Sequence, residues 1–258
     1  MTIHERAVYA TQPVALQQQI NELFKDVDSS AGEGQVIAVV VPASNLLRGG
    51  PVSAAVFKAL THLDFETVIV VAPSNTGVFQ RLTICSVNTY PTPLGDVTVN
   101  DQVRNELCDE DDDIFLDDTG HYQAAGADVQ LPFLQTLNDA FRVVPIVMGE
   151  ETPALCKELG QAVAEVMYNR RMLVVACADI LGATEESLAQ FRTYLETLDI
   201  PRLMNLLNGD SIKVNGKGAV LVAAIAALQR RADSARVLHL ALPADGAPGY
   251  MGAILYRK

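Results

Sequence analysis

VIVVAPSNTGVF, Val68 to Phe79, is the stretch that decides the fold. It begins as an apolar, largely β-branched run, which is typical of a strand buried on both faces of a parallel sheet. The run then meets a proline and opens into a small polar loop. VIAVVVPASNLLRGG, Val36 to Gly50, repeats this pattern earlier in the chain. With the helix that apolar spacing predicts between them, the two stretches indicate a βαβ unit at the start of an α/β fold.

The remainder of the chain continues this alternation of helices and strands. Apolar residues at helical spacing predict helices over residues 13–26, 52–63, 127–137, 153–166, 184–196, 201–207 and 218–229. Apolar runs predict strands over residues 35–41, 66–72, 82–86, 97–99, 141–148, 172–178, 236–241 and 251–256. We therefore predict one α/β domain over residues 1–258. Its central sheet is mainly parallel and flanked by helices, with a helical extension over residues 1–30.

Composition narrows the class of protein. The chain has 258 residues and a formal charge of −12. This charge argues against a nucleic-acid binder, which needs a basic face, and against docking on an anionic membrane. No apolar run reaches the ~20 residues of a membrane-spanning helix, and the N-terminal residues do not resemble a secretory signal. The four cysteines form no CxxC pair, which favours reduced thiols in a cytoplasmic protein.

Residues 110–118 are rich in aspartate, with the run EDDD and a second aspartate pair. A solvated acidic loop and a cation site are the two interpretations of such a segment. The central glycine and the distal glutamate that an EF-hand loop requires are both missing. The sequence therefore favours the solvated loop.

Ligand sites in open α/β sheets lie beyond the carboxyl ends of the strands, and the first such loop covers residues 42–50. Asn45 and Arg48 offer hydrogen bonds and a cation there. Gly49 and Gly50, just before Pro51, could form an anion-binding helix N-terminus. An ordinary loop and helix cap is the alternative interpretation.

Two further loops offer uncharged polar groups. Ser74 and Asn75 follow the second strand and could bind a polar ligand, although turn formation alone also explains them. The G-x-S-x-G context of a nucleophilic serine is missing. Asn215 lies in a loop before the last long helix and is a candidate for the same cleft.

Cys177 and Asp179 lie at the end of the strand predicted over residues 172–178. A carboxylate directly after an apolar run is costly to bury without a partner, so Asp179 is a candidate for a pocket. A cysteine at a strand end is more often part of the core. His121 is the one histidine in a polar loop near acidic groups. Cys177, Asp179 and His121 could supply three metal ligands, but their spacing does not favour such a site.

The most specific motifs are DVQLPFLQTL followed by FRVVPIVMGEE, within Asp128 to Glu151, and YPTPLGDVTVND, Tyr90 to Asp101. Together with VVVPASNLLRGG, VIVVAPSNTG, VVACADILG and NGKGAVLVAAIAAL, they resemble the Memo family, also labelled AmmeMemoRadiSam system protein B. The resemblance implies a fold related to the class III extradiol dioxygenases, which hold a non-haem iron between strand ends. It also makes a peptide groove conceivable, because one member of the family is described as binding phosphotyrosine peptides.

The chain departs from this family at the residues that the resemblance implies as metal ligands. Where the family has three histidines, a cysteine and a further histidine, this chain has Ala43, Asn75, Gly182, Asn215 and Ala125, in that order. Asp179 is retained, and His121 matches a more variable histidine. Alanine and glycine side chains donate nothing to a metal, and asparagine poorly replaces imidazole or thiolate for iron, copper or zinc.

The sequence therefore predicts a metal-free, cofactor-free pseudoenzyme of the Memo type. Its polar cleft would bind a small polar ligand, a peptide or a protein partner. One alternative is a metal-free hydrolase or lyase, in which Asp179 is the general acid or base. The other is a dioxygenase-like oxidoreductase whose metal has moved to a displaced site.

Overall fold

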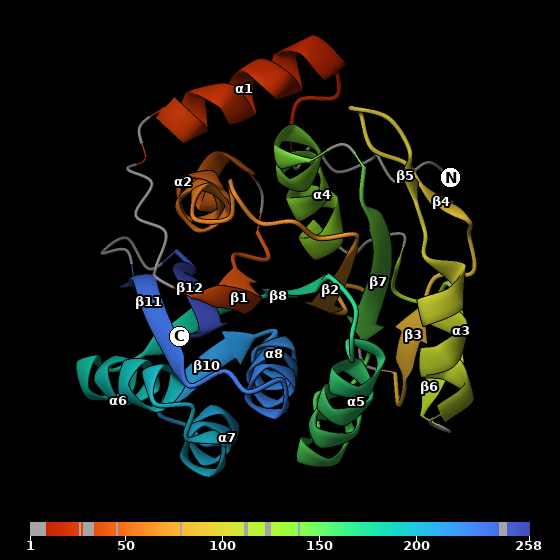
Figure 1. Ribbon diagram of the computed structural model, residues 1–258. Helices are drawn as coiled ribbons and strands as arrows, with labels where there is room; N and C mark the ends of the chain where they lie inside the picture. Colours follow the sequence, from red (N-terminus) through yellow and green to blue (C-terminus); the bar gives the residue numbers. More distant parts are fainter. Residues whose placement is uncertain are drawn as a thin grey trace.

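The computed structural model describes residues 9–25, 27, 34–44, 46–77, 79–110, 113–121, 125–138, 140–242 and 247–258. A ten-stranded sheet crosses the middle of this part of the chain, and helices cover both of its faces (Figure 1). The α/β class predicted from the sequence is confirmed. Asn45 and His4 lie outside the described residues.

The helices are α1 (Pro13–Lys25), α2 (Leu46–Lys58), α3 (Asp101–Glu110), α4 (Ala125–Leu137), α5 (Pro153–Val166), α6 (Glu185–Glu196), α7 (Ile200–Asn208) and α8 (Lys217–Gln229). The strands of the large sheet are β1 (Gln35–Val41), β2 (Thr67–Pro73), β3 (Leu82–Ile84), β6 (Ile114–Leu116), β7 (Arg142–Met148), β8 (Met172–Cys177), β9 (Asp179–Ala183), β10 (Ile212–Asn215), β11 (Ser234–Ala241) and β12 (Gly249–Arg257). A separate hairpin pairs β4 (Thr89–Tyr90) with β5 (Val97–Thr98). No helix among the described residues is long and apolar enough to cross a membrane.

The sheet is mixed, with a parallel centre. Its order is β10-β9-β12-β1-β8-β2-β7-β3-β6, and β11 pairs with β12. The central strands β1, β8, β2 and β7 pair in parallel, whereas β12, β9, β10 and β3 join by antiparallel pairs. The four central strands are buried along nearly their whole length, which explains their continuous apolar runs. Their carboxyl ends lie along one edge of the sheet.

Two hydrophobic cores lie on the two faces of the sheet. On one face, α1, α2 and α4 pack together, and the Phe133 ring stacks on Phe57 and meets Phe24 edge to face. On the other face, α5, α7 and α8 pack together. Gly160 of α5 lies so close to α8 that a Cβ there would be 2.8 Å from the Cβ of Ile225. The small side chains of α8 allow this helix to pack closely against both α5 and the central sheet.

The prediction of an open loop over residues 42–50 is wrong, because α2 already begins at Leu46. Gly49 and Gly50 lie inside this helix, so they form no helix N-terminus for an anion. A Cβ on Gly49 would lie 2.7 Å from the Cβ of Pro42, and one on Gly50 would lie 2.8 Å from Leu23. The two glycines therefore serve close packing rather than a loop.

Other elements were missed because they are short or polar. Residues 179–183, predicted as loop, form β9, and Asn215 ends β10 rather than lying in a loop. Residues 114–116 of the predicted acidic loop form the edge strand β6. Helix α3 has few apolar residues, with Val103 and Leu107 buried, so its helical spacing gave no signal.

Candidate functional site

Asp179 begins β9 and ties this strand to the end of β1. Its Oδ1 accepts a hydrogen bond from the backbone N–H of Ala43 at 3.0 Å, and its Oδ2 accepts one from the hydroxyl of Ser44. The side chain is buried, with 5% of its residue surface exposed. Burial raises the pKa of this carboxyl, and the hydrogen bonds from Ser44 and Ala43 oppose that rise. Much of the hydrogen-bonding capacity of Asp179 is therefore used inside the protein.

Arg48 and Tyr250 lie beside this junction. Tyr250 pairs with Asp179 across β12 and β9, and its hydroxyl hydrogen bonds with Ser44 and Arg48. Burial and the nearby Asp179 raise the pKa of this hydroxyl, while Arg48 lowers it. The guanidinium that the sequence suggested for anion binding thus takes part in the same closed polar cluster.

Cys177 is fully buried just before Asp179. A Cβ on Gly126 of α4 would lie 3.3 Å from its Sγ, and one face of the thiol is thus covered by this helix. Burial, followed by the nearby charge of Asp179, raises the pKa of the thiol well above its ordinary value. The thiol is a neutral core group at neutral pH.

His121 lies at a different part of the sheet. Its Nε2 hydrogen bonds with the carbonyl of Thr83 at 3.1 Å, while its Nδ1 has no partner among the described residues. Burial lowers the pKa of the imidazole to about 4. Thr83 belongs to β3, four strands away from β1, which is about 19 Å at the usual strand spacing. The structure therefore does not bring His121 to Asp179.

The acidic residues near His121 are held by protein groups. Asp118 accepts hydrogen bonds from the backbone N–H and the hydroxyl of Ser86, at 2.8 and 3.0 Å. Asp117 accepts hydrogen bonds from Thr119 and pairs with Arg81. These contacts fix the ends of β3 and β6.

The polar residues of the DVQLPF motif support the core. Tyr90 donates a hydrogen bond of 2.7 Å to Asp128, and burial raises the pKa of this carboxyl to about 7. Gln130 donates one of 2.8 Å to the carbonyl of Pro42, directly after β1. The motif thereby fixes α4 against the end of β1.

A polar cleft of about 520 Å³ opens at the carboxyl ends of β2 and β7. Its walls also include the end of β10 and the starts of α5 and α8. Two of the side chains predicted from the sequence, Ser74 and Asn215, line it. The lining residues are Pro73, Ser74, Gly77, Met148, Gly149, Glu150, Glu151, Thr152, Pro153, Asn208, Asn215 and Lys217. No histidine or cysteine is among them.

Glu151 is the residue of this cleft that the sequence reasoning missed. It follows β7, and its Oε1 accepts a hydrogen bond of 3.1 Å from the backbone N–H of Gly218, in the first turn of α8. Burial raises the pKa of this carboxyl to about 7, while the backbone N–H groups of Gly218 and Gly216 and the charge of Lys217 limit the rise. The available signal was a carboxylate three residues after the apolar run VPIVM, comparable to Asp179 after the run MLVVAC.

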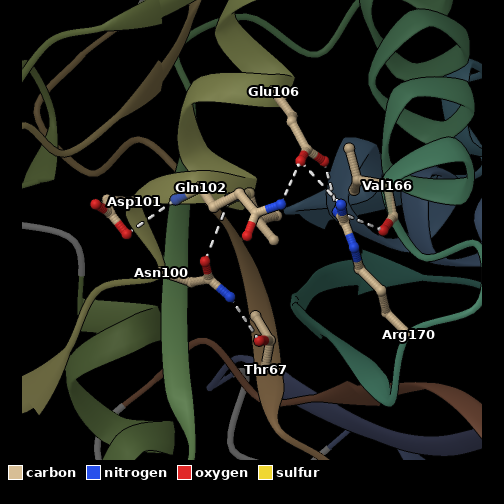
Figure 2. A network of polar contacts seen from close by, with 8 residues as sticks. Thr67, Asn100, Asp101, Gln102, Glu106, Val166 and Arg170 are labelled. Atoms are coloured by element: carbon tan, nitrogen blue, oxygen red, sulfur yellow. Dashed lines mark hydrogen bonds and ion pairs between the residues drawn. The ribbon is translucent and has the colours of Figure 1, made fainter.

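A second hollow, of about 440 Å³, lies at the opposite edge of the sheet, and its residues Arg170 and Arg171 are paired with carboxylates. Asn100 joins the start of α3 to Thr67, and Arg170 contacts both oxygens of Glu106 (Figure 2). Arg171 pairs with Asp64 and Glu66. The network holds α3, α5 and the starts of β2 and β8 together, which is a structural role.

The metal centre that the family resemblance implies does not fit these residues. Ala43 is buried and has no donor side chain, and Gly182 pairs with Lys213 in the β9–β10 ladder. Asn75 and Asn215 offer amides, which suit transition metals poorly. Among the described residues, no group of three or more histidine, cysteine, aspartate or glutamate side chains could hold a metal ion.

The fold and the cleft define an α/β protein with a polar site at the carboxyl edge of its central sheet. Comparison with known proteins gives its family: residues 4–248 match the model for "Memo-like protein", and the chain belongs to that family. A MEMO1 family protein of Ignicoccus hospitalis is 30% identical over 72% of this chain and 68% of its own length. One of Saccharolobus islandicus is 26% identical over 95% of both chains. An uncharacterized protein of Escherichia coli K12 shares the fold, with a TM-score of 0.58, 15% identity, and coverage of 85% of this chain and 100% of its own.

Proposed function

We propose that this protein is a metal-independent binding member of the Memo-like family. Its ligand is a small polar molecule, or the polar end of a peptide or protein partner, held in the cleft at the ends of β2 and β7. The single observation that carries this proposal is the chemistry of that cleft. It offers Ser74, Asn215, Glu151 and Lys217 to a ligand, in a volume typical of small-molecule sites.

The residues at the family's metal positions support the same conclusion. Ala43, Gly182 and Asn215 supply neither imidazole nor thiolate, and Asp179 is engaged by Ala43 and Ser44. The charge of −12 argues against nucleic acid as the partner. The four cysteines, none of which forms a disulfide, fit the reducing cytoplasm that we infer for this protein.

A direct test uses nuclear magnetic resonance of ¹⁵N-labelled protein, purified without a histidine tag and treated with a chelator. A panel of amino acids, sugars, nucleosides and short peptides is added, and the amide signals of the cleft are followed. We expect at least one class to shift these signals, and Asn215→Leu to abolish the shift. Asn88→Leu, at an exposed residue outside the cleft, is the matched control. Ligand binding that appears only after one equivalent of iron, copper or zinc is added back would contradict the proposal.

A metal-free hydrolase or lyase is the second candidate, because burial raises the pKa of Asp179 and the hydroxyls of Ser44 and Tyr250 surround it. Asp179→Asn distinguishes the two. An enzyme of this kind would lose turnover of its substrate, whereas the binding protein would change only in stability. The displaced metal site of Cys177, Asp179 and His121 gains no support from the geometry, because His121 is bound to β3.

A further inference from the structure

Two opposite charges line the same cleft without neutralising each other. The Oε1 of Glu151 is held by the backbone N–H of Gly218. The Nζ of Lys217 donates instead to Oδ1 of Asn208, at 2.8 Å. The charge of Lys217 lowers the pKa of Glu151, yet among the described residues no ion pair joins the two side chains. A cleft wall thus carries an acceptor and a donor of opposite charge, close enough to interact and too far apart to bond directly.

The other lining groups add one further charge, the carboxylate of Glu150. Ser74, Thr152, Asn208 and Asn215 are neutral donors and acceptors, and Glu150 is the second carboxylate. With Lys217, the lining residues carry a net charge of −1 when both glutamates are ionised. A phosphate or another multivalent anion would meet two carboxylates and a single ammonium. A simple cation would leave the ammonium of Lys217 without a counter-charge from the ligand.

We propose that the cleft binds a small zwitterion of the amino-acid type, with its ammonium at Glu151 and its carboxylate at Lys217. This inference rests on the proposed function and names its ligand class. Each ligand charge then makes a charge-assisted hydrogen bond to an opposite charge of the protein. The neutral amides and hydroxyls accept or donate the remaining hydrogen bonds. A volume of about 520 Å³ leaves room for a side chain beyond the two charged groups.

The pH dependence of binding follows from the groups that face Glu151. These are Lys217 and the backbone of α8, Cys156 of α5, and the adjacent Glu150. The thiol of Cys156 has a pKa raised to about 12 and stays neutral, so Glu151 is the group that titrates near neutrality. An ammonium prefers the ionised carboxylate, so the affinity should rise as pH increases through about 7. Between pH 6 and pH 8 we expect a gain of about tenfold.

The test compares four probes by the same resonance titration: glycine, acetate, methylammonium and trimethylglycine. Glycine carries both charges, acetate and methylammonium carry one each, and trimethylglycine keeps both charges without N–H donors. We expect glycine to bind at least about tenfold more tightly than each of the others. The amide signals of Gly216 and Gly218, beside Glu151, report on binding.

Two variants separate the two halves of the site. Glu151→Gln keeps an oxygen acceptor for Gly218. It should lower the affinity for glycine by about tenfold, and leave the affinity for acetate unchanged or increase it. Lys217→Gln should lower the affinity for both glycine and acetate. Glu165→Gln on α5 and Lys213→Gln on β10 remove the same charges at exposed residues outside the cleft, and should change the affinity for glycine less than twofold.

The outcomes separate this inference from the proposed function. If acetate binds as well as glycine, or if the two controls act as strongly as the two site variants, the zwitterion inference is wrong. If glycine shifts no cleft signal while another class of the larger panel does, the inference is again wrong and the binding function stands. If no member of the panel shifts a cleft signal, both the zwitterion inference and the proposed binding function are wrong.

Discussion

Asp179 and Glu151 are carboxylates that each follow an apolar strand of the same sheet, yet their surroundings differ. Asp179 receives a backbone N–H and a hydroxyl from the loop after β1, and 5% of its residue surface is exposed. Glu151 receives the N–H of Gly218 and lines a cleft of about 520 Å³. A buried carboxylate whose partners come from the protein closes a junction. One that keeps an open side is available to a ligand.

Gly216 lies between the junction at Asp179 and the cleft at Glu151, so its substitution should have the largest effect on stability. Its φ is +87°, and a Cβ there would lie 2.2 Å from the carbonyl oxygen of Cys177, next to Asp179. We expect Gly216→Ala to lower the free energy of unfolding by about 4 kcal/mol, from left-handed strain and a backbone clash. Urea denaturation measures this. Gly209→Ala, where the nearest atoms lie 3.5 Å away, is the control and should cost less than about 0.5 kcal/mol.

Removing each carboxylate in turn tests the comparison directly. Asp179→Ala leaves the buried N–H of Ala43 without its acceptor and should cost about 3 kcal/mol. Glu151→Ala lets water of the cleft reach Gly218 and should cost about 1 kcal/mol. Both are read from urea denaturation at pH 7. A larger loss for Glu151→Ala would mean that the cleft carboxylate, rather than the junction, has the structural role.

The sequence predicted the central strands well because burial on both faces makes them continuous apolar runs. Residues 35–41 and β1 coincide, and residues 66–72 differ from β2 by one position. The prediction of helices and strands from the sequence failed where the apolar pattern is weak. Strands β9 and β10 are short and partly exposed, and two glycines before Pro51 concealed the first turn of α2.

The candidate site was only half predictable, for a reason of geometry. Ser74 and Asn215 were found because they follow apolar segments or match family motifs, and both line the cleft. Glu151 follows an apolar run in the same way, but its partner Gly218 lies 67 residues further along the chain. Which carboxylate keeps an open side depends on such long-range contacts, and a single sequence does not contain them.

The pH dependence of stability should sharpen the contrast further. Burial raises the pKa of Glu151 to about 7 from an ordinary value of 4.5. Between these pH values the folded state binds more protons than the unfolded state, so stability falls as pH rises through this window. Glu151→Gln removes the titration, and relative to the wild type it should gain about 2.5 kcal/mol between pH 5 and pH 8. Thermal unfolding at both pH values measures the difference. An equal response of the two proteins would show that Glu151 does not titrate in this range.

The smallest effect is expected where the family's histidine has been lost. A Cβ on Gly182 would meet no atom within 4 Å, and its φ is not positive, so Gly182→His should change the free energy of unfolding by less than about 0.5 kcal/mol. The added imidazole should nevertheless bind no zinc beyond the wild-type level in a calorimetric titration. Ala43 supplies no ligand, and Asp179 is held by Ala43 and Ser44, so one imidazole would lack the further ligands that zinc requires. Stoichiometric zinc binding by this variant would show that Asp179 can leave its junction. The distinction between a closed and an open carboxylate would then be lost.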